Sequence, residues 1–148
     1  MAKLGKFAHG KYNLKNPQKY LGNGSPLYRS SWEWVVQKMC DEHQNIIEWC
    51  SEGIRIPYTD PLTGYPTFYV PDFVVKFIDK YNRTRVEMWE IKPKNQAVKE
   101  AVGRSKYNQA QFIKNQAKWE VARAYCKQNG IFFRVISEDD IFQLSGKK

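Results

Sequence analysis

The sequence predicts a single domain in which helices pack against a mixed β-sheet, in an α/β or α+β arrangement. Three observations predict this class. An amphipathic helical pattern starts at Ser31, segments rich in aromatic and β-branched residues follow between residues 54 and 91, and a long helical pattern after Pro93 leads into the apolar run Ile131–Ile136. Because a long helix between two strands is the usual crossover of a parallel pair, the sheet should contain parallel as well as antiparallel pairs.

Length and composition set the outer limits of this prediction. A chain of 148 residues and 17.5 kDa forms one domain of ordinary size, with at most short arms. Its 42% hydrophobic and 15% aromatic residues exclude wholesale disorder. Three cysteines without a CxxC spacing and two histidines exclude a zinc cage, and they indicate reduced thiols and a cytoplasmic location. No apolar stretch has the length of a membrane span or of a signal-peptide core, so we expect no membrane partner.

The first part of the chain is distinct from the rest. Residues 1–26 are predicted to form a basic, irregular N-terminal arm, and residues 27–148 to form the folded domain. The arm contains the turn-forming pairs Asn16-Pro17 and Asn23-Gly24 and shows no sustained hydrophobic period.

The first predicted helix runs from Ser31 to about Asp41. Its apolar residues recur at i, i+3, i+4, i+7 and i+8, and they are Trp32, Val35, Val36, Met39 and Cys40. Glu33 lies on the flank of this stripe and has two interpretations that the sequence leaves open. It completes the capping box Ser30-Ser-Trp-Glu33, in which its side chain would accept a hydrogen bond from the Ser30 N–H, and the same position can serve a functional site.

The predicted strands follow this helix. Pro57 favours a sheet edge or a strand end for the first of them. Aromatic and β-branched residues indicate three strand regions, and turn residues separate them. The order is Ile54–Tyr58, turn Asp60–Gly64, Thr67–Val70 together with Phe73–Ile78, turn Asp79–Asn82, and Arg85–Ile91. A hairpin or a meander is therefore expected.

A long helix is predicted after Pro93 and ends at Gly130, a residue type that commonly follows the last helical turn. Ile131–Ile136 is then a strand, and the capping box Ser137-Glu-Asp-Asp140 opens a short final helix. The predicted order is helix, three strands, helix, strand, helix. The apolar face of the long helix is expected to carry Tyr107, Ala110, Ile113, Ala117, Val121, Ala124 and Tyr125.

Positive charge is concentrated in two segments. The chain has a net charge of +9, and residues 1–32 and 92–118 each carry +6, so the remaining residues together carry −3. Basic segments around an acidic centre suit a protein that contacts phosphates with its periphery and holds a metal ion at its centre, and a solvated lysine-rich surface is the alternative. The candidate phosphate contacts are Arg29, Lys94 and Lys118. With Asn115 and Gln116, Lys118 begins a face of the long helix that can approach DNA phosphates or the site, and a plain polar helix face is the alternative.

Two carboxylates and a lysine are predicted to meet at the ends of two strands. Asp72 precedes one strand, and Glu90 and Lys92 end the next. Residues i and i+2 of a strand point to the same face, so Glu90 and Lys92 project together, and a hairpin brings Asp72 beside them. The two carboxylates, with the backbone carbonyl of Ile91, can ligate a hard divalent ion, and Lys92 can position water or stabilise developing charge.

These residues also have a purely structural interpretation. Asp72 can end a loop, and Glu90 and Lys92 can form a solvated ion pair that contributes ~0–1 kcal/mol. The functional interpretation is favoured because Val86 and Met88 lie on the same face of the strand, so the pair continues an apolar row.

This constellation resembles the PD-(D/E)xK nuclease superfamily, whose restriction-endonuclease-like α/β core has a mixed sheet flanked by helices in the order α-β-β-β-α-β. With further segments the chain is similar to the head completion nucleases of large tailed phages, a family similar to the endonuclease subunit of heteromeric bacterial transposases. The segments run from Tyr28 to Asp140: Tyr28-Arg-Ser-Ser-Trp-Glu33, Trp49-Cys-Ser-Glu52, Ile56-Pro-Tyr58, Tyr69-Val-Pro-Asp-Phe73, Glu90-Ile-Lys-Pro93, Asn115-Gln-Ala-Lys-Trp119 and Glu138-Asp-Asp140.

The resemblance implies a magnesium-dependent DNA nuclease, with Mn²⁺ as a substitute for Mg²⁺. Glu33, Asp72, Glu90 and Lys92 would form its active-site set. The implied partners are double-stranded DNA and phage portal or neck proteins, and the implied locations are the host cytoplasm and the virion. The alternative is a non-catalytic DNA-binding plug at a portal or neck. A host-type repair or transposition nuclease would differ in its partner rather than in its chemistry.

Overall fold

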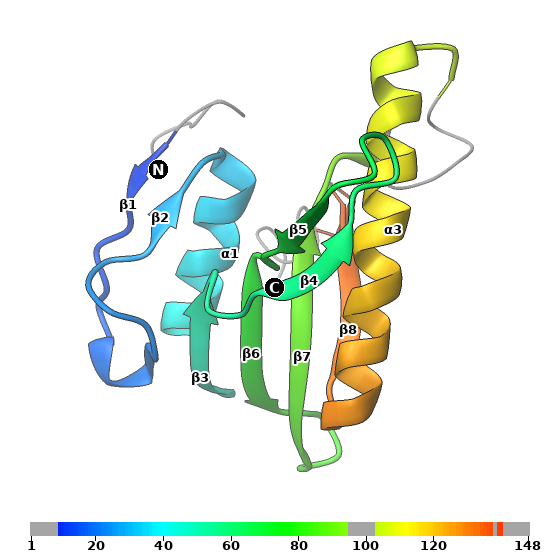
Figure 1. The fold of residues 1–148 in the computed structure, drawn as a ribbon. Coiled ribbons are helices and arrows are strands. Elements are labelled where there is room, and N and C mark those ends of the chain that lie inside the picture. Colours follow the sequence, from blue (N-terminus) through cyan, green and yellow to red (C-terminus); the bar gives the residue numbers. More distant parts are fainter. Residues whose placement is uncertain (1–8, 95–102, 138, 141–148) are drawn as a thin grey trace.

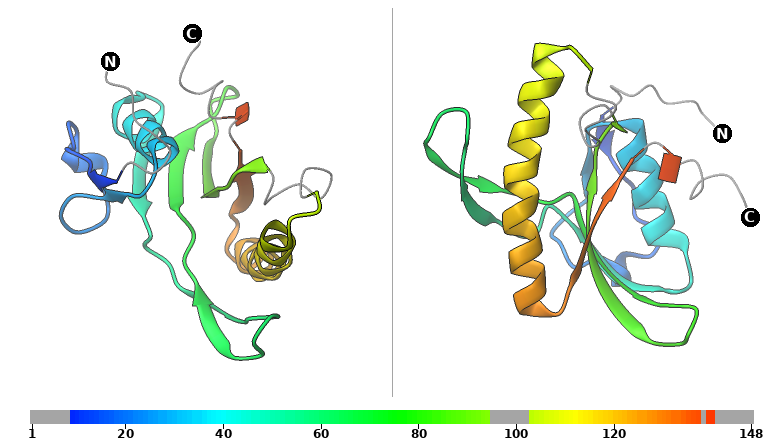
Figure 2. Two further views of the ribbon diagram at one scale, coloured as in Figure 1. Left: turned by 90° about the horizontal axis from the view of Figure 1, so that it is seen from above. Right: turned by 90° about the vertical axis from the view of Figure 1, so that its right-hand side faces the viewer.

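The computed structural model describes residues 9–94, 103–137 and 139–140. In this part of the chain a four-stranded sheet lies between helix α1 on one face and helix α3 on the other (Figures 1 and 2). Within the sheet order β3-β6-β7-β8, the pair β7 and β8 is parallel and the other pairs are antiparallel. The predicted α/β class and mixed sheet are confirmed. The elements are α1 (Ser31–Glu42), β3 (Ile46–Ser51), β6 (Phe73–Ile78), β7 (Thr84–Ile91), α3 (Lys106–Asn129) and β8 (Phe132–Ile136).

Alternation along β7 supplies side chains to both layers of the core. Met88 packs with Trp119 of α3, whereas Trp89 and Ile91 belong to the cluster that contains Val36 of α1. Successive residues of a strand point to opposite faces, so β7 is buried from both sides. Its end therefore lies in the interior of the fold rather than at an open surface.

The first strand of the sheet is β3, which the sequence pattern fails to indicate. A register shift between Ile46 and Glu48 marks a bulge, so that Ile46 and Trp49 are both buried although they are three residues apart. The bulge breaks the alternation by which a strand is recognised. The strand predicted at Ile54–Tyr58 is present as β4 (Ile56–Thr59), but it pairs with β5 (Pro66–Tyr69) in a separate hairpin and not with the main sheet. With β3 as the first strand, the main sheet and its two helices follow the predicted order of helix, three strands, helix and strand.

Helix α1 has the predicted extent, and α3 ends before Gly130 as predicted, but α3 starts only at Lys106 and buries a different face. The Gly130 that follows α3 has a left-handed φ of 69°, which glycine adopts without strain. The prediction for the apolar face is wrong at Tyr107 and Ile113, which are exposed because the first turns of α3 extend beyond the sheet (Figure 1). The residues that α3 buries are Asn115, Trp119, Ala122 and Cys126.

The N-terminal segment is held against the domain. Asp41 of α1 is completely buried and accepts hydrogen bonds from the Tyr12 hydroxyl and from the N–H groups of Lys15 and Asn16. The described part of the segment has little regular structure, as the sequence predicts, but these contacts fix it to α1. Its regular elements are β1 (Gly10–Lys11), the 3-10 helix η1 (Pro17–Lys19) and β2 (Leu27–Tyr28), with β1 and β2 paired antiparallel.

The predicted capping box after β8 forms one of its contacts, since the Ser137 N–H donates to the Asp140 carboxylate at 3.0 Å. Asp139 and Asp140 are helical, and the remaining residues of the predicted final helix, 138 and 141–148, lie outside the described residues. Among the helices that the structure describes, none is long and apolar enough to cross a membrane.

Candidate active site

The candidate site lies at the end of the sheet where the two inner strands meet, at the start of β6 and the end of β7. The two strands are antiparallel neighbours with Phe73 opposite Trp89, so Asp72 and Glu90 lie at the same edge. The Asp72 carboxylate accepts a hydrogen bond from the Ile91 N–H at 2.7 Å. The structure therefore brings Asp72 beside the Glu90-Ile-Lys92 segment, as the sequence predicts.

Glu90 is buried on the side of the sheet that α3 covers. One carboxylate oxygen accepts a hydrogen bond from the Tyr69 hydroxyl at 2.6 Å, and the other lies 3.7 Å from the Lys92 Nζ. Met88, which shares this face of β7, is completely buried. Only 4% of Glu90 is exposed, so this carboxylate is not half of a solvated surface ion pair.

Burial raises the pKa values of both acids. The pKa of Asp72 lies well above its usual range because of its burial and, in addition, the charges of Glu90 and Glu33. Burial also raises the pKa of Glu90, although Lys92 and the Tyr69 hydrogen bond act in the opposite direction. Buried acids whose charge is only partly compensated are typical of functional sites.

Glu33 caps α1 and also contributes charge to the site. Its carboxylate accepts a hydrogen bond from the Arg29 N–H at 2.8 Å, so the capping contact is made with Arg29 and not with the predicted Ser30. The Ser30 hydroxyl oxygen accepts the reciprocal bond from the Glu33 N–H at 3.1 Å. Burial raises the pKa of Glu33, and its carboxylate interacts electrostatically with Lys92 and Asp72. The two interpretations that the sequence leaves open are therefore compatible.

The donor set fits a hard cation with two protein carboxylates. Among the described residues, no three His, Cys, Asp or Glu side chains gather around one metal position. The half-buried Asp72 and the buried Glu90 nevertheless supply two carboxylates at this end of the sheet, and Mg²⁺ commonly uses one or two carboxylates together with water and substrate phosphate oxygens. The carbonyl of Ile91 stays a prediction, because the contacts described for Ile91 are those of its N–H and its buried side chain.

Lys118 interacts electrostatically with the acids of the site. It is half-buried on α3, and its burial and the charge of Lys92 lower its pKa. In turn, the Lys118 charge lowers the pKa of Glu90. Asn115, one turn earlier on α3, is completely buried, so it does not lie on an exposed face that contacts DNA.

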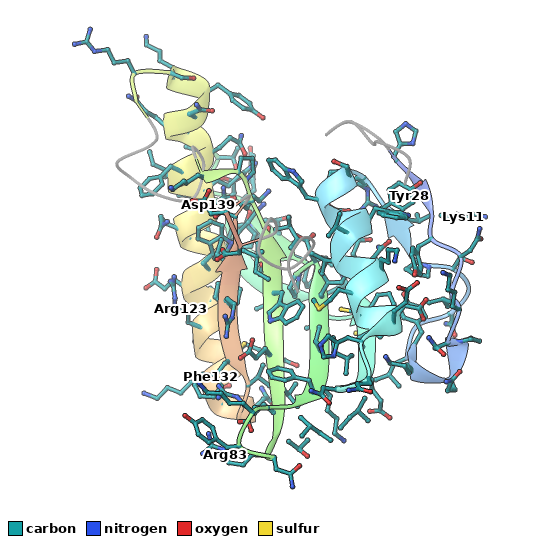
Figure 3. The ribbon with its side chains drawn as sticks, turned by 180° about the vertical axis from the view of Figure 1, so that it is seen from behind. Lys11, Tyr28, Arg83, Arg123, Phe132 and Asp139 are labelled. Carbon is teal, nitrogen blue, oxygen red and sulfur yellow. The ribbon has the colours of Figure 1, made fainter. Side chains whose placement is uncertain are left out.

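The other candidate phosphate contacts have acidic partners. The Arg29 guanidinium forms an ion pair with Glu52, and the Lys94 Nζ lies 2.8 Å from the Asp139 carboxylate. Figure 3 labels Asp139 at the end of β8 that lies towards the site, and Phe132 at the opposite end. The DNA-binding role of Arg29 and Lys94 stays a prediction.

Tyr69 is the site residue that sequence reasoning misses. It belongs to the β4–β5 hairpin, is buried, and reaches Glu90 from outside the sheet. Its burial and the Glu90 charge raise its pKa. The available signal is its position three residues before Asp72, but only the fold of the hairpin shows that its hydroxyl meets Glu90.

Two comparisons with known proteins agree with this geometry. Residues 43–138 match the family described as TnsA-like endonuclease N terminal. The chain is also 31% identical to the head completion nuclease of Enterobacteria phage T4 over 149 aligned residues, which cover 93% of this chain and 96% of that protein. The family match includes Asp72, Glu90 and Lys92 and begins after Glu33.

Proposed function

The chain belongs to the TnsA-like endonuclease family, and from that premise we propose that it is a magnesium-dependent endonuclease that hydrolyses phosphodiester bonds of double-stranded DNA. The observation that carries the proposal is the convergence of Asp72, Glu90 and Lys92 at one edge of the sheet. Two neighbouring acids whose pKa values are raised are costly to stability, and a binding site for a metal ion gives that arrangement a use.

Each residue of the proposed site has a distinct task. Asp72 and Glu90 would hold Mg²⁺, or Mn²⁺ as a substitute, with the Ile91 carbonyl as a further oxygen ligand. The bound ion would polarise the scissile phosphate and lower the pKa of a coordinated water. Lys92 would orient the attacking water or stabilise the negative charge of the transition state. Glu33 would accept hydrogen bonds from water in the outer part of the site.

The similarity to a head completion nuclease supports a more specific role. We infer that the chain acts at the head-tail joining step of phage virion assembly, in the host cytoplasm or in the virion. Its partners there would be double-stranded DNA and a portal or neck protein.

A non-catalytic DNA-binding plug at a portal or neck is the second candidate function. The net charge of +9 favours it, because cations alone can hold phosphates. The acids Asp72 and Glu90 favour the enzyme, since a plug needs no acids whose pKa values are raised.

Cleavage of closed circular and linear DNA in Mg²⁺, Mn²⁺ or EDTA tests the proposal. We expect nicking or linearisation of the circle with either metal ion and none in EDTA. The variant Lys92→Ala should lose more than about 100-fold in turnover, because it removes a cation that acts on the transition state. The control is Lys80→Ala, an exposed lysine in the β6–β7 turn, which should cleave as wild type does. A wild-type protein that binds DNA but cleaves neither substrate in either metal ion would establish the plug instead.

A further inference from the structure

The β4–β5 hairpin presents an apolar outer face to solvent. The hairpin stands apart from the main sheet and extends beside α3 (Figures 1 and 2). Its inner face is buried against α3 through Ile56, Tyr58 and Tyr69. On its outer face and in its turn, four large apolar side chains are exposed: Leu62, Tyr65, Phe68 and Val70. An exposed cluster of this kind on one ribbon indicates a binding surface.

This hairpin is continuous with the candidate active site. Phe68 is exposed to the extent of 51%, whereas the next residue, Tyr69, is buried and hydrogen-bonded to Glu90. The chain then passes through Pro71, which is buried, to Asp72. A molecule that covers Phe68 therefore lies next to the strand that carries Tyr69 to Glu90.

Cations flank the same ribbon. The Arg55 guanidinium lies 4.3 Å from the centre of the Phe68 ring, and Lys114 of α3 lies 3.6 Å from Asp60 at the base of the hairpin turn. Lys118, one turn further along α3, acts electrostatically on Glu90 and Asp72. Positive side chains thus extend from the hairpin to the acids, and their charge is complementary to a phosphate backbone.

We propose that the β4–β5 hairpin enters a groove of duplex DNA beside the scissile phosphate, with Tyr65 and Phe68 against sugars and base edges and with Arg55 and Lys114 near the phosphates. This inference rests on the proposed function, because it takes the substrate of the site as the occupant. A two-stranded ribbon has a width that DNA grooves admit, and apolar side chains that insert from such elements are a known mode of groove binding. Duplex DNA is favoured over a protein partner by the flanking cations and by the continuity with the site.

Binding of a fluorescent DNA duplex in EDTA, which keeps the DNA intact, tests the hairpin separately from cleavage. The double variant Tyr65→Ala with Phe68→Ala should bind about 10-fold more weakly or worse, because aromatic contacts with DNA contribute strongly to affinity. Phe68→Glu should weaken binding further, since it also repels phosphates. Melting temperatures close to that of the wild type would show that these exposed substitutions leave the fold intact.

Tyr81 provides a matched control. It is an exposed aromatic residue with Lys80 and Arg83 near its ring, and it lies in the β6–β7 turn at the opposite end of the sheet from Asp72, where Figure 3 labels Arg83. Tyr81→Ala and Tyr81→Glu should bind the duplex as the wild type does. The proposal is overturned if the Phe68 variants bind as the wild type does, or if the Tyr81 variants lose equal affinity. Failure of the proposed function is a different result, namely no metal-dependent cleavage by the wild-type protein.

Discussion

Two acidic regions of this molecule, Asp41 and the pair Asp72 and Glu90, differ in how far hydrogen-bond donors compensate their negative charge. Asp41 is completely enclosed beneath the N-terminal segment, and its carboxylate accepts hydrogen bonds from three donors at 2.8–2.9 Å. A buried carboxylate with this many donors is well satisfied, and it serves to fix its donors in place. Asp41 thereby holds a segment with little secondary structure of its own.

At the opposite extreme are Asp72 and Glu90. Asp72 accepts a hydrogen bond from the Ile91 N–H, and Glu90 accepts one from Tyr69, but the negative charges of Glu90 and Glu33 act on Asp72. The pKa values of both are raised. The contrast teaches that burial alone does not mark a functional acid. The balance between hydrogen-bond donors and neighbouring negative charge marks a functional acid, because this balance determines whether the ionised group stabilises or destabilises the folded protein.

Removing one charge from the candidate site should have the largest effect. We expect Asp72→Asn and Glu90→Gln each to lower metal-dependent cleavage by more than about 100-fold, because each removes a ligand charge that the bound ion requires. The free energy of unfolding in EDTA should stay equal or rise, since the amide keeps the shape and removes repulsion. Urea denaturation and cleavage assays of the same preparations measure both. A large loss of stability with normal specific activity would mean that these acids are structural, like Asp41.

The reverse outcome is expected at the N-terminal anchor. Asp41→Ala should lower the free energy of unfolding by about 3–5 kcal/mol, because it leaves several buried donors without an acceptor. Specific activity of the folded fraction should be unchanged, since Asp41 is not part of the site. Tyr12→Phe is the graded companion, because it removes only the hydroxyl donor and should cost about 1 kcal/mol. Urea denaturation provides both values, and a selective loss of turnover in either variant would break the distinction between the two regions.

The sequence is sufficient to predict the site acids but not the anchor or the first strand of the sheet. Asp72, Glu90 and Lys92 sit at the ends of strands with clear β patterns, and the hairpin between them fixes which residues meet. The bulge in β3 hides that strand, since it buries both Ile46 and Trp49 at a three-residue spacing that breaks the two-residue alternation of a strand. The role of Asp41 depends on donors more than 20 residues away in a segment without periodicity, which no local pattern reports.

The hydrogen bond from Tyr69 of the β4–β5 hairpin to Glu90 provides a smaller test of the difference between Asp41 and the site acids. Tyr69→Phe removes the donor that holds Glu90 and keeps the ring that packs on α3, so the fold should be retained. We expect about a 10-fold weaker affinity for Mn²⁺, which is the usual scale for a residue that orients a metal ligand. Titration of Mn²⁺ by electron paramagnetic resonance measures it without DNA. Tyr58→Phe, on the same inner face of the hairpin, is the control, and equal loss in both variants would assign the effect to packing.

The smallest expected effect is on the pH dependence of stability in EDTA. The folded pKa of Asp72 lies above its unfolded value of ~3.9, so the folded state binds a proton more readily. The contribution of this group to stability is fully present below the unfolded pKa and is lost as the pH rises through the folded pKa. In the wild type, this group makes the free energy of unfolding decline as the pH rises from about 4 through the folded pKa of Asp72. Asp72→Asn should therefore reduce that decline.

Glu42 provides the opposite case, because ion pairs with Lys38 and Lys15 lower its pKa. Its contribution is present above the unfolded pKa, so Glu42→Gln should lower stability at neutral pH and have less effect in acid. Urea denaturation of both variants across this range should show changes in slope of opposite sign. Equal slopes would mean that Asp72 is as well compensated as a surface ion pair, and the contrast with Asp41 would then have no electrostatic basis.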